Sequence, residues 1–230
     1  MRQNFIINLD INLTSTQQFS ETVWQMNFMK NFSKYQHILY APGRGYDLSV
    51  LNVFRNELSK RGYIIHLLPT AYDEGYFNQT DLLNRIPIEC TWWIGISLGA
   101  SVLWTLSSLV ESRSIRLTVI NPFADRERLS REKGFNLRGQ WNFKPIDYQS
   151  VAEHIDVVVS IYDEAIGARH SLELLSSAQP EVKKLILVKS DHQINNLEAQ
   201  IELVKLLTHT EGDSHADGKY CDIYSPAGKI

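Results

Sequence analysis

Cysteine is scarce in this 230-residue sequence, which contains only Cys90 and Cys221. Two cysteines cannot form the disulfide framework that stabilises many secreted proteins, and neither lies in a spacing typical of metal ligands. We therefore expect two free thiols in a reducing compartment, which predicts a cytoplasmic protein. The sequence shows no motif for a metal or another cofactor, so we expect none.

An excess of positive charge is also missing. The 23 basic and 26 acidic side chains give a formal net charge of -3, so there is no electrostatic reason to expect nucleic acid or an anionic membrane as a partner.

Long apolar runs are absent too. The uncharged stretch 90–110 contains Gly, Ser and Thr, which predicts a strand, a turn and a helix rather than a membrane span. The apolar amino terminus is interrupted by Asn8, Asp10 and Asn12, unlike an export signal.

Short β-branched runs alternate with amphipathic stretches from residue 37 onward. Parallel strands need crossover helices of this kind, so we predict an α/β fold with a mostly parallel central sheet and helices on both faces. The strand candidates are 37–41, 63–68, 91–94, 115–121, 155–161 and 185–189, and the helix candidates are 48–61, 98–111, 171–177 and 195–207. The length predicts a single domain over 1–210, with a short insertion at about 122–150 and a loose tail at 211–230.

A serine between two glycines gives the sharpest chemical signal. The segment Gly95-Ile96-Ser97-Leu98-Gly99 follows a strand candidate directly and precedes a helix candidate directly, which is the context of a nucleophile elbow. Glycines two residues before and after the serine permit a tight turn that pushes its hydroxyl out above the sheet. A simpler interpretation is that Ser97 only caps the following helix.

A serine hydroxyl is a poor nucleophile unless a histidine takes its proton and a carboxylate holds that histidine. His192 follows the last strand candidate, and Asp163 follows the strand candidate 155–161. The carboxyl ends of parallel strands meet at one edge of a sheet, where ligands gather. We therefore predict Ser97, Asp163 and His192 as catalytic residues.

Other side chains compete for two of these roles. His170 lies soon after Asp163 and is a rival base, but it opens a helix candidate, so we expect a surface histidine there. Glu164 and Asp191 are fallback acids. All three alternatives remain open at the level of sequence.

Acyl transfer also needs backbone amides that stabilise the oxyanion of the tetrahedral intermediate. Leu98 supplies one candidate amide, because it follows the serine directly. The second should come from Gly43 or Arg44, in the glycine-rich loop after the first parallel strand.

The predicted insertion is rich in basic and aromatic residues. Its candidate substrate-binding residues are Arg126, Arg128, Arg138 and Trp141. Guanidinium groups would recognise an acidic acyl group or a phosphate-bearing carrier. Because acidic residues are interspersed here, a solvated charged helix is the alternative.

These motifs and their chain order make the sequence resemble the α/β-hydrolase superfamily over residues 35–207. The matching parts are the elbow around Ser97, the loop at Pro42-Gly43-Arg44-Gly45, Asp163 and His192. Pro42 stands where many members have histidine, and the short insertion implies a small lid or an open site. The resemblance implies an α/β hydrolase fold.

The function expected from these residues is a serine hydrolase that cleaves an ester or thioester through an acyl-enzyme on Ser97. Its partner would be a small acyl substrate, either free or carrier-bound. One alternative is an acyltransferase, in which an alcohol or amine replaces water. The other is a catalytically silent binding protein that kept the fold.

Overall fold

The structure is a computed structural model that describes residues 36–43, 48–68, 78–110, 114–134, 144–177, 182–208 and 220–223. These residues belong to one compact unit, Tyr35–Ile230. The predictions for Arg44, Arg138 and Trp141 fall outside the described residues. Among the described residues, no helix is long and apolar enough to cross a membrane.

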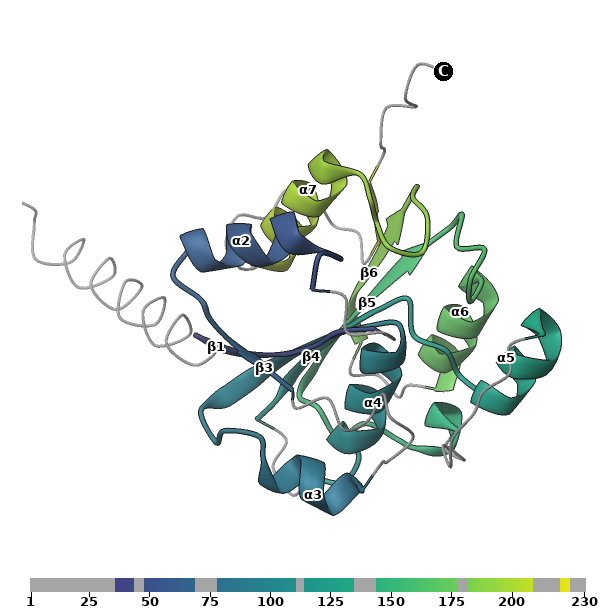
Figure 1. Cartoon of the computed structure of the whole chain (residues 1–230), viewed down its shortest axis with the longest axis horizontal. Coiled ribbons are helices and arrows are strands. Elements are labelled where there is room, and N and C mark those ends of the chain that lie inside the picture. The colour runs from purple at the N-terminus through teal and green to yellow at the C-terminus, as the bar shows by residue number, and fades with distance from the viewer. Residues whose placement is uncertain are drawn as a thin grey trace, which may run out of the picture. The chain divides into compact units, whose positions relative to one another are not determined.

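The described strands form one seven-stranded sheet with the order β2-β1-β3-β4-β5-β6-β7 (Figure 1). Every neighbouring pair is parallel. The strands are β1 (His37–Ala41), β2 (Ile64–Leu67), β3 (Cys90–Ile96), β4 (Arg116–Ile120), β5 (His154–Ser160), β6 (Val182–Val188) and β7 (Tyr220–Ile223). A helix lies between each consecutive pair of these strands, as parallel crossovers require. The predicted parallel sheet is confirmed.

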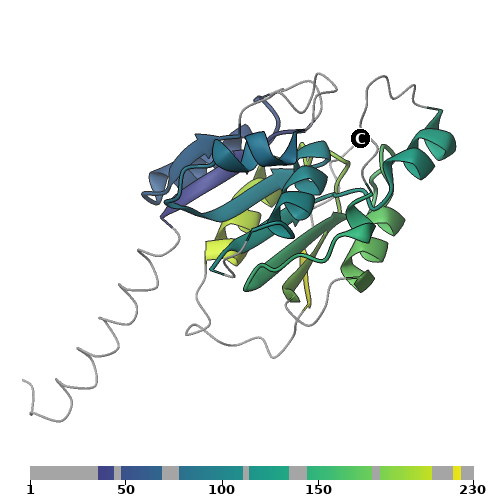
Figure 2. The ribbon, with the colours of Figure 1, turned by 90° about the horizontal axis from the view of Figure 1, so that it is seen from below.

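Helices cover both faces of the sheet, as predicted. The helices are α2 (Asn52–Lys60), α3 (Gln79–Asn84), α4 (Leu98–Ser107), α5 (Arg126–Lys133), α6 (Ala168–Ser177) and α7 (Leu197–Thr208), with a 3₁₀ turn, η3, at Pro145–Asp147. Helices α2 and α7 pack against one face, while α3, α4, α5 and α6 contribute to the core on the other. Figures 1 and 2 show these two layers with the strands between them.

Strand β3 is buried on both faces and lies inside the sheet. Trp92 and Ile94 point into the core beneath α2 and α7, whereas Trp93 points into the core beneath α4. This alternation follows from the two-residue period of a strand. Helix α4 is buried from Gly99 to Ser107. The turn between β3 and α4 is therefore held by two buried elements.

A buried ion pair joins β4 to β5. Two nitrogens of Arg116, Nε and Nη2, donate to Asp156 Oδ2 at 2.8 and 2.7 Å. Arg116 also donates to the carbonyl oxygen of Leu207 at 2.7 Å, and His154 Nε2 lies 2.8 Å from Asp156 Oδ1. Burial raises the pKa of Asp156, but the Arg116 charge and the His154 contact outweigh it and hold the pKa well below its usual range.

Two segments differ from the sequence prediction. Strand β7 lies in the predicted loose tail, so that expectation is wrong for Tyr220–Ile223, whose backbone extends the sheet. Helix α5 lies in the predicted insertion. It buries Leu129, so its sequence lacks the repeating apolar residues from which a helix is predicted. Asp125 caps this helix by accepting a hydrogen bond from the Arg128 amide at 3.0 Å.

We predict that Arg116→Met lowers the free energy of unfolding at pH 7 by about 3–5 kcal/mol, because it leaves the Asp156 carboxylate buried without its charge partner. Urea unfolding followed by circular dichroism measures the change. The exposed Arg85→Met variant is the control and should stay within about 0.5 kcal/mol of the wild type. A loss below about 1 kcal/mol for Arg116→Met would contradict the prediction.

The same pair predicts a pH dependence. The pKa of Asp156 is lower in the folded protein than its unfolded value of about 3.9. Its contribution to stability is therefore present above that pH and is lost as the pH falls toward the folded-state value. The stability difference between wild type and Arg116→Met should consequently shrink as the pH falls and the Asp156 carboxylate of the variant becomes protonated.

Candidate active site

Ser97 occupies a strained turn between β3 and α4. Its backbone has φ 54° and ψ −120°, a combination that is unfavourable for a residue with a side chain. Ser97 stands at the cap position of α4, yet its side chain makes no capping hydrogen bond. The structure therefore does not support the simpler interpretation of Ser97 as a helix cap.

Two glycines allow this turn to form. A Cβ added to Gly95 would lie 2.6 Å from Ala100 Cα, and one added to Gly99 would lie 2.2 Å from the carbonyl oxygen of Ala41. Real Cβ atoms do not approach backbone this closely, so the turn and the end of β1 can pack together only with glycine at both positions.

Gly43 lies directly against Ser97. A Cβ at Gly43 would be 3.4 Å from Ser97 Cβ and 3.9 Å from Ser97 Oγ. Leu98, the first residue of α4, has an amide with no acceptor inside the helix, as is usual for the first turn. Of the residues predicted for the oxyanion hole, Gly43 therefore lies next to Ser97 in space, and Leu98 follows it in the sequence.

Asp163 and His192 form a hydrogen-bonded pair. The pair joins the loop after β5 to the loop after β6, with His192 Nδ1 2.8 Å from Asp163 Oδ2. The other oxygen, Asp163 Oδ1, accepts hydrogen bonds from the amides of Ala165 at 3.0 Å and Ile166 at 2.9 Å. Both oxygens of the carboxylate are therefore held, which fixes the direction in which it faces the imidazole.

The surroundings of Asp163 favour its ionised form. Burial raises the pKa of this carboxyl. The hydrogen bond and charge of His192 and the amides of Ile166 and Gly167 lower the pKa by more than burial raises it, so the net shift is downward. An ionised carboxylate can only accept, so Nδ1 of His192 carries the proton in this contact. With that proton on Nδ1, Nε2 is the nitrogen that can offer a lone pair to a substrate or a serine hydroxyl.

Asn121, at the end of β4, was not predicted from the sequence. Its Nδ2 donates to the carbonyl oxygen of His192 at 2.8 Å and to Ser160 Oγ at 2.9 Å, and its Oδ1 accepts from the Ser160 amide at 2.7 Å. The preceding residue, Ile120, accepts a hydrogen bond from the Ser97 amide at 2.8 Å. The end of β4 therefore links the Ser97 turn to the His192 loop. An asparagine directly before a proline at a strand end was the available signal.

His170 is buried, with 1% of its surface exposed, so the expected surface histidine is wrong. Its Nε2 lies 3.2 Å from Glu132 Oε2, and its Nδ1 lies 3.3 Å from Arg128 Nη2. Burial and the Arg128 charge lower its pKa, and Glu132 opposes them. The burial of His170 depends on a tertiary contact, because Arg128 and Glu132 of α5 lie against its ring.

The fallback acids have other roles in the described contacts. Asp191 accepts hydrogen bonds from the Asn195 amide at 3.1 Å and from Asn195 Nδ2 at 2.6 Å, which closes the turn before α7. Glu164 is exposed. The carboxylate that contacts His192 belongs to Asp163.

Arg128 is engaged with α6. Its Nη1 and Nη2 donate to the two carboxylate oxygens of Glu173 at 2.9 and 2.6 Å, a bidentate contact. This ion pair offsets much of the guanidinium charge, and the role of Arg128 in substrate binding stays a prediction. Arg126 is half-buried on the same helix, and its role stays a prediction.

No protein-family model matches the sequence, and no curated protein matches it. Solved structures do match. An esterase domain from a Rhodothermus marinus protein has a TM-score of 0.58 at 15% identity, over 75% of this chain and 84% of that one. Est1E from Butyrivibrio proteoclasticus has a TM-score of 0.57 at 14% identity, over 78% and 89%. The mouse α/β hydrolase domain-containing protein 10 has a TM-score of 0.55 at 13% identity, over 74% of this chain and 87% of that one.

These similarities show the fold: the chain has the fold of the α/β hydrolases, and structural neighbours include esterases. The expected resemblance is therefore confirmed at the level of architecture.

The strain at Ser97 leads to a prediction about stability. Ser97→Gly should raise the free energy of unfolding by about 1 kcal/mol, because glycine relieves a backbone conformation that costs about 1–3 kcal/mol for other residues. Ser97→Ala keeps the Cβ and should show no such gain. Thermal and urea unfolding of the three proteins measure the difference, and equal stability of the glycine and alanine variants would contradict the role of strain.

Proposed function

We propose that this protein is a serine hydrolase that cleaves an ester or thioester through an acyl-enzyme on Ser97. The observation that carries the proposal is a strained serine whose side chain does not cap its helix, on the same sheet edge as a hydrogen-bonded Asp163–His192 pair. Ser97 and His192 are both half-buried, which leaves part of each open to a substrate.

In the proposed first step, His192 Nε2 takes the proton of Ser97 as Oγ attacks the carbonyl carbon of the substrate. Asp163 holds the imidazole and stabilises the positive charge that it acquires. The oxyanion that develops would receive hydrogen bonds from the amide of Leu98 and from an amide at Gly43 or Arg44.

In the second step the tetrahedral intermediate collapses, and His192 gives its proton to the departing alcohol or thiol. Water then enters, loses a proton to His192 and attacks the acyl group on Ser97, which releases a carboxylic acid and restores the serine. An acyltransferase would use the same residues with an alcohol or amine in place of water. Analysis of the products with and without an added alcohol separates the two activities.

The proposal predicts the kinetics of two variants. Ser97→Ala should abolish hydrolysis of a p-nitrophenyl acyl ester, and Asp163→Asn should lower kcat by up to about 10⁴-fold, because the amide cannot stabilise a charged imidazole. The release of p-nitrophenol under saturating substrate measures both effects.

Two neighbouring substitutions serve as controls. Ser108→Ala removes a hydroxyl from the other end of α4, and Glu164→Gln neutralises the carboxyl next to Asp163; each should leave kcat within a few-fold of wild type. Circular dichroism establishes that all four variants are folded. Full activity in Ser97→Ala would refute the nucleophile, and a larger loss in Glu164→Gln than in Asp163→Asn would refute the acid.

A further inference from the structure

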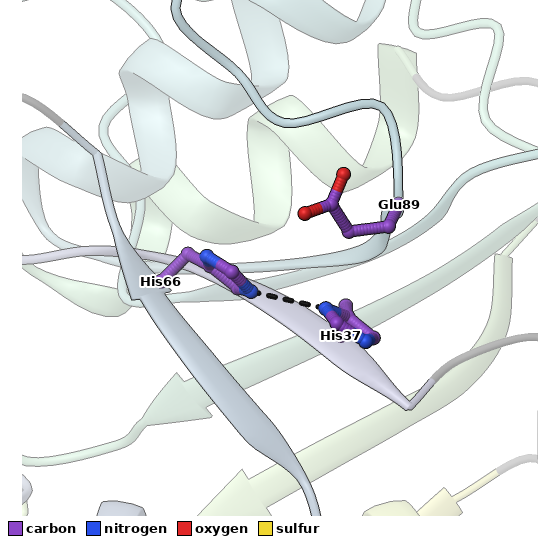
Figure 3. Close-up of side chains that lie close together, drawn as sticks. All are labelled: His37, His66 and Glu89. Atoms are coloured by element: carbon purple, nitrogen blue, oxygen red, sulfur yellow. Dashed lines mark hydrogen bonds between the residues drawn. The ribbon is translucent and has the colours of Figure 1, made fainter.

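Two histidines and a glutamate meet near the amino ends of strands β1 and β3 (Figure 3). His37 is the first residue of β1, Glu89 directly precedes β3, and His66 comes from the edge strand β2. The nitrogen atoms His37 Nδ1 and His66 Nε2 lie 3.0 Å apart. One ligand atom from each of the three residues lies within 4.8 Å of the others.

Strand register explains why the two imidazoles face each other. His66 is the partner of Leu39, which is two residues after His37 on β1. Residues two apart on a strand share a face, so His37 and His66 lie on the same face of neighbouring strands. Their rings are nearly parallel, with an interplanar angle of 22° and centroids 5.3 Å apart. The sheet itself therefore holds the two nitrogens together.

We propose that His37, His66 and Glu89 bind one divalent transition-metal ion, with zinc as the best match. Two neutral imidazoles and a carboxylate are the ligands that zinc takes in sites that keep a fourth position for water. Ligand atoms about 2.0–2.1 Å from a tetrahedral ion lie about 3.3 Å apart. The two nitrogens need to separate by only a few tenths of an ångström to reach this distance.

Glu89 completes the donor set at low cost. It is exposed, whereas the two histidines are half-buried, so its carboxylate can rotate toward an ion without disturbing the core. Its negative charge also offsets part of the positive charge that the ion brings next to two neutral rings. The half-buried histidines supply the rigid part of the site, and the exposed carboxylate supplies the adaptable part.

The metal site is separate from the proposed active site. Ser97 follows the carboxyl end of β3, whereas Glu89 precedes its amino end, and a seven-residue strand such as Cys90–Ile96 spans about 20 Å. An ion here would join the edge strand β2 to β1 and to the start of β3. We therefore assign it a stabilising role, independent of ester cleavage.

Zinc chloride titrated into the full chain, after removal of metal with a chelator, tests the site in competition with a chromophoric zinc indicator. We expect one zinc per chain, at least 10-fold weaker binding in His37→Ala, His66→Ala and Glu89→Gln, and unchanged binding in Glu198→Gln. Glu198 is exposed on α7 and is the matched control for Glu89. His192→Ala should also keep its zinc, which excludes binding at the Asp163–His192 pair.

Thermal unfolding gives a second readout. Zinc at about 100 times the wild-type dissociation constant should raise the wild-type Tm by about 5–10 °C, and at the same zinc concentration the shift in His37→Ala should be smaller by about half or more. Glu89→Gln changes only an exposed side chain, so it remains informative if a histidine variant does not fold. Failure of the wild type to bind zinc, or binding that none of the three substitutions weakens, would overturn the proposal. No substrate is used, so the result does not depend on the proposed hydrolase activity.

Discussion

The close approach of the β3–α4 turn to the end of β1 is the constraint on which the candidate site depends. Gly95 and Gly99 have no room for a Cβ, because Ala100 and the Ala41 carbonyl occupy the space. At this crossing Ser97 takes a positive φ, and the strand before it and the helix after it are both buried. The free energy of packing two buried elements therefore holds one strained serine in place.

The parallel sheet supplies the second requirement, which is that residues far apart in sequence end at one edge. Ser97, Asp163 and His192 each follow a strand, and β4 lies between the first two of those strands. Asn121 occupies the end of β4 and binds the backbone of the His192 loop. The proposed hydrolase site would depend on such positioning contacts as much as on the reacting groups, because small displacements of a base lower the rate strongly.

The sequence was enough to predict the parts of the molecule that local pattern determines. Apolar runs with turns between them predicted β1 to β6, and the glycines around Ser97 predicted the strained turn. The order of Ser97, Asp163 and His192 predicted a pair that the structure places in contact. The burial of His170, the Arg128–Glu173 contact and the four residues of β7 could not be predicted, because each depends on a partner from another element. The cluster of His37, His66 and Glu89 could not be predicted for the same reason, because its residues come from three separate segments that no sequence motif connects.

Covalent labelling tests the central claim most directly. A serine-directed fluorophosphonate reacts only with a hydroxyl that a neighbouring base activates, so it reports the chemistry of the site without knowledge of the substrate. The folded wild-type protein, treated with the reagent, digested and mapped by mass spectrometry, should carry one adduct, on Ser97, and heat-unfolded protein should carry none. An adduct on a different residue, or no adduct on the folded protein, would contradict the account.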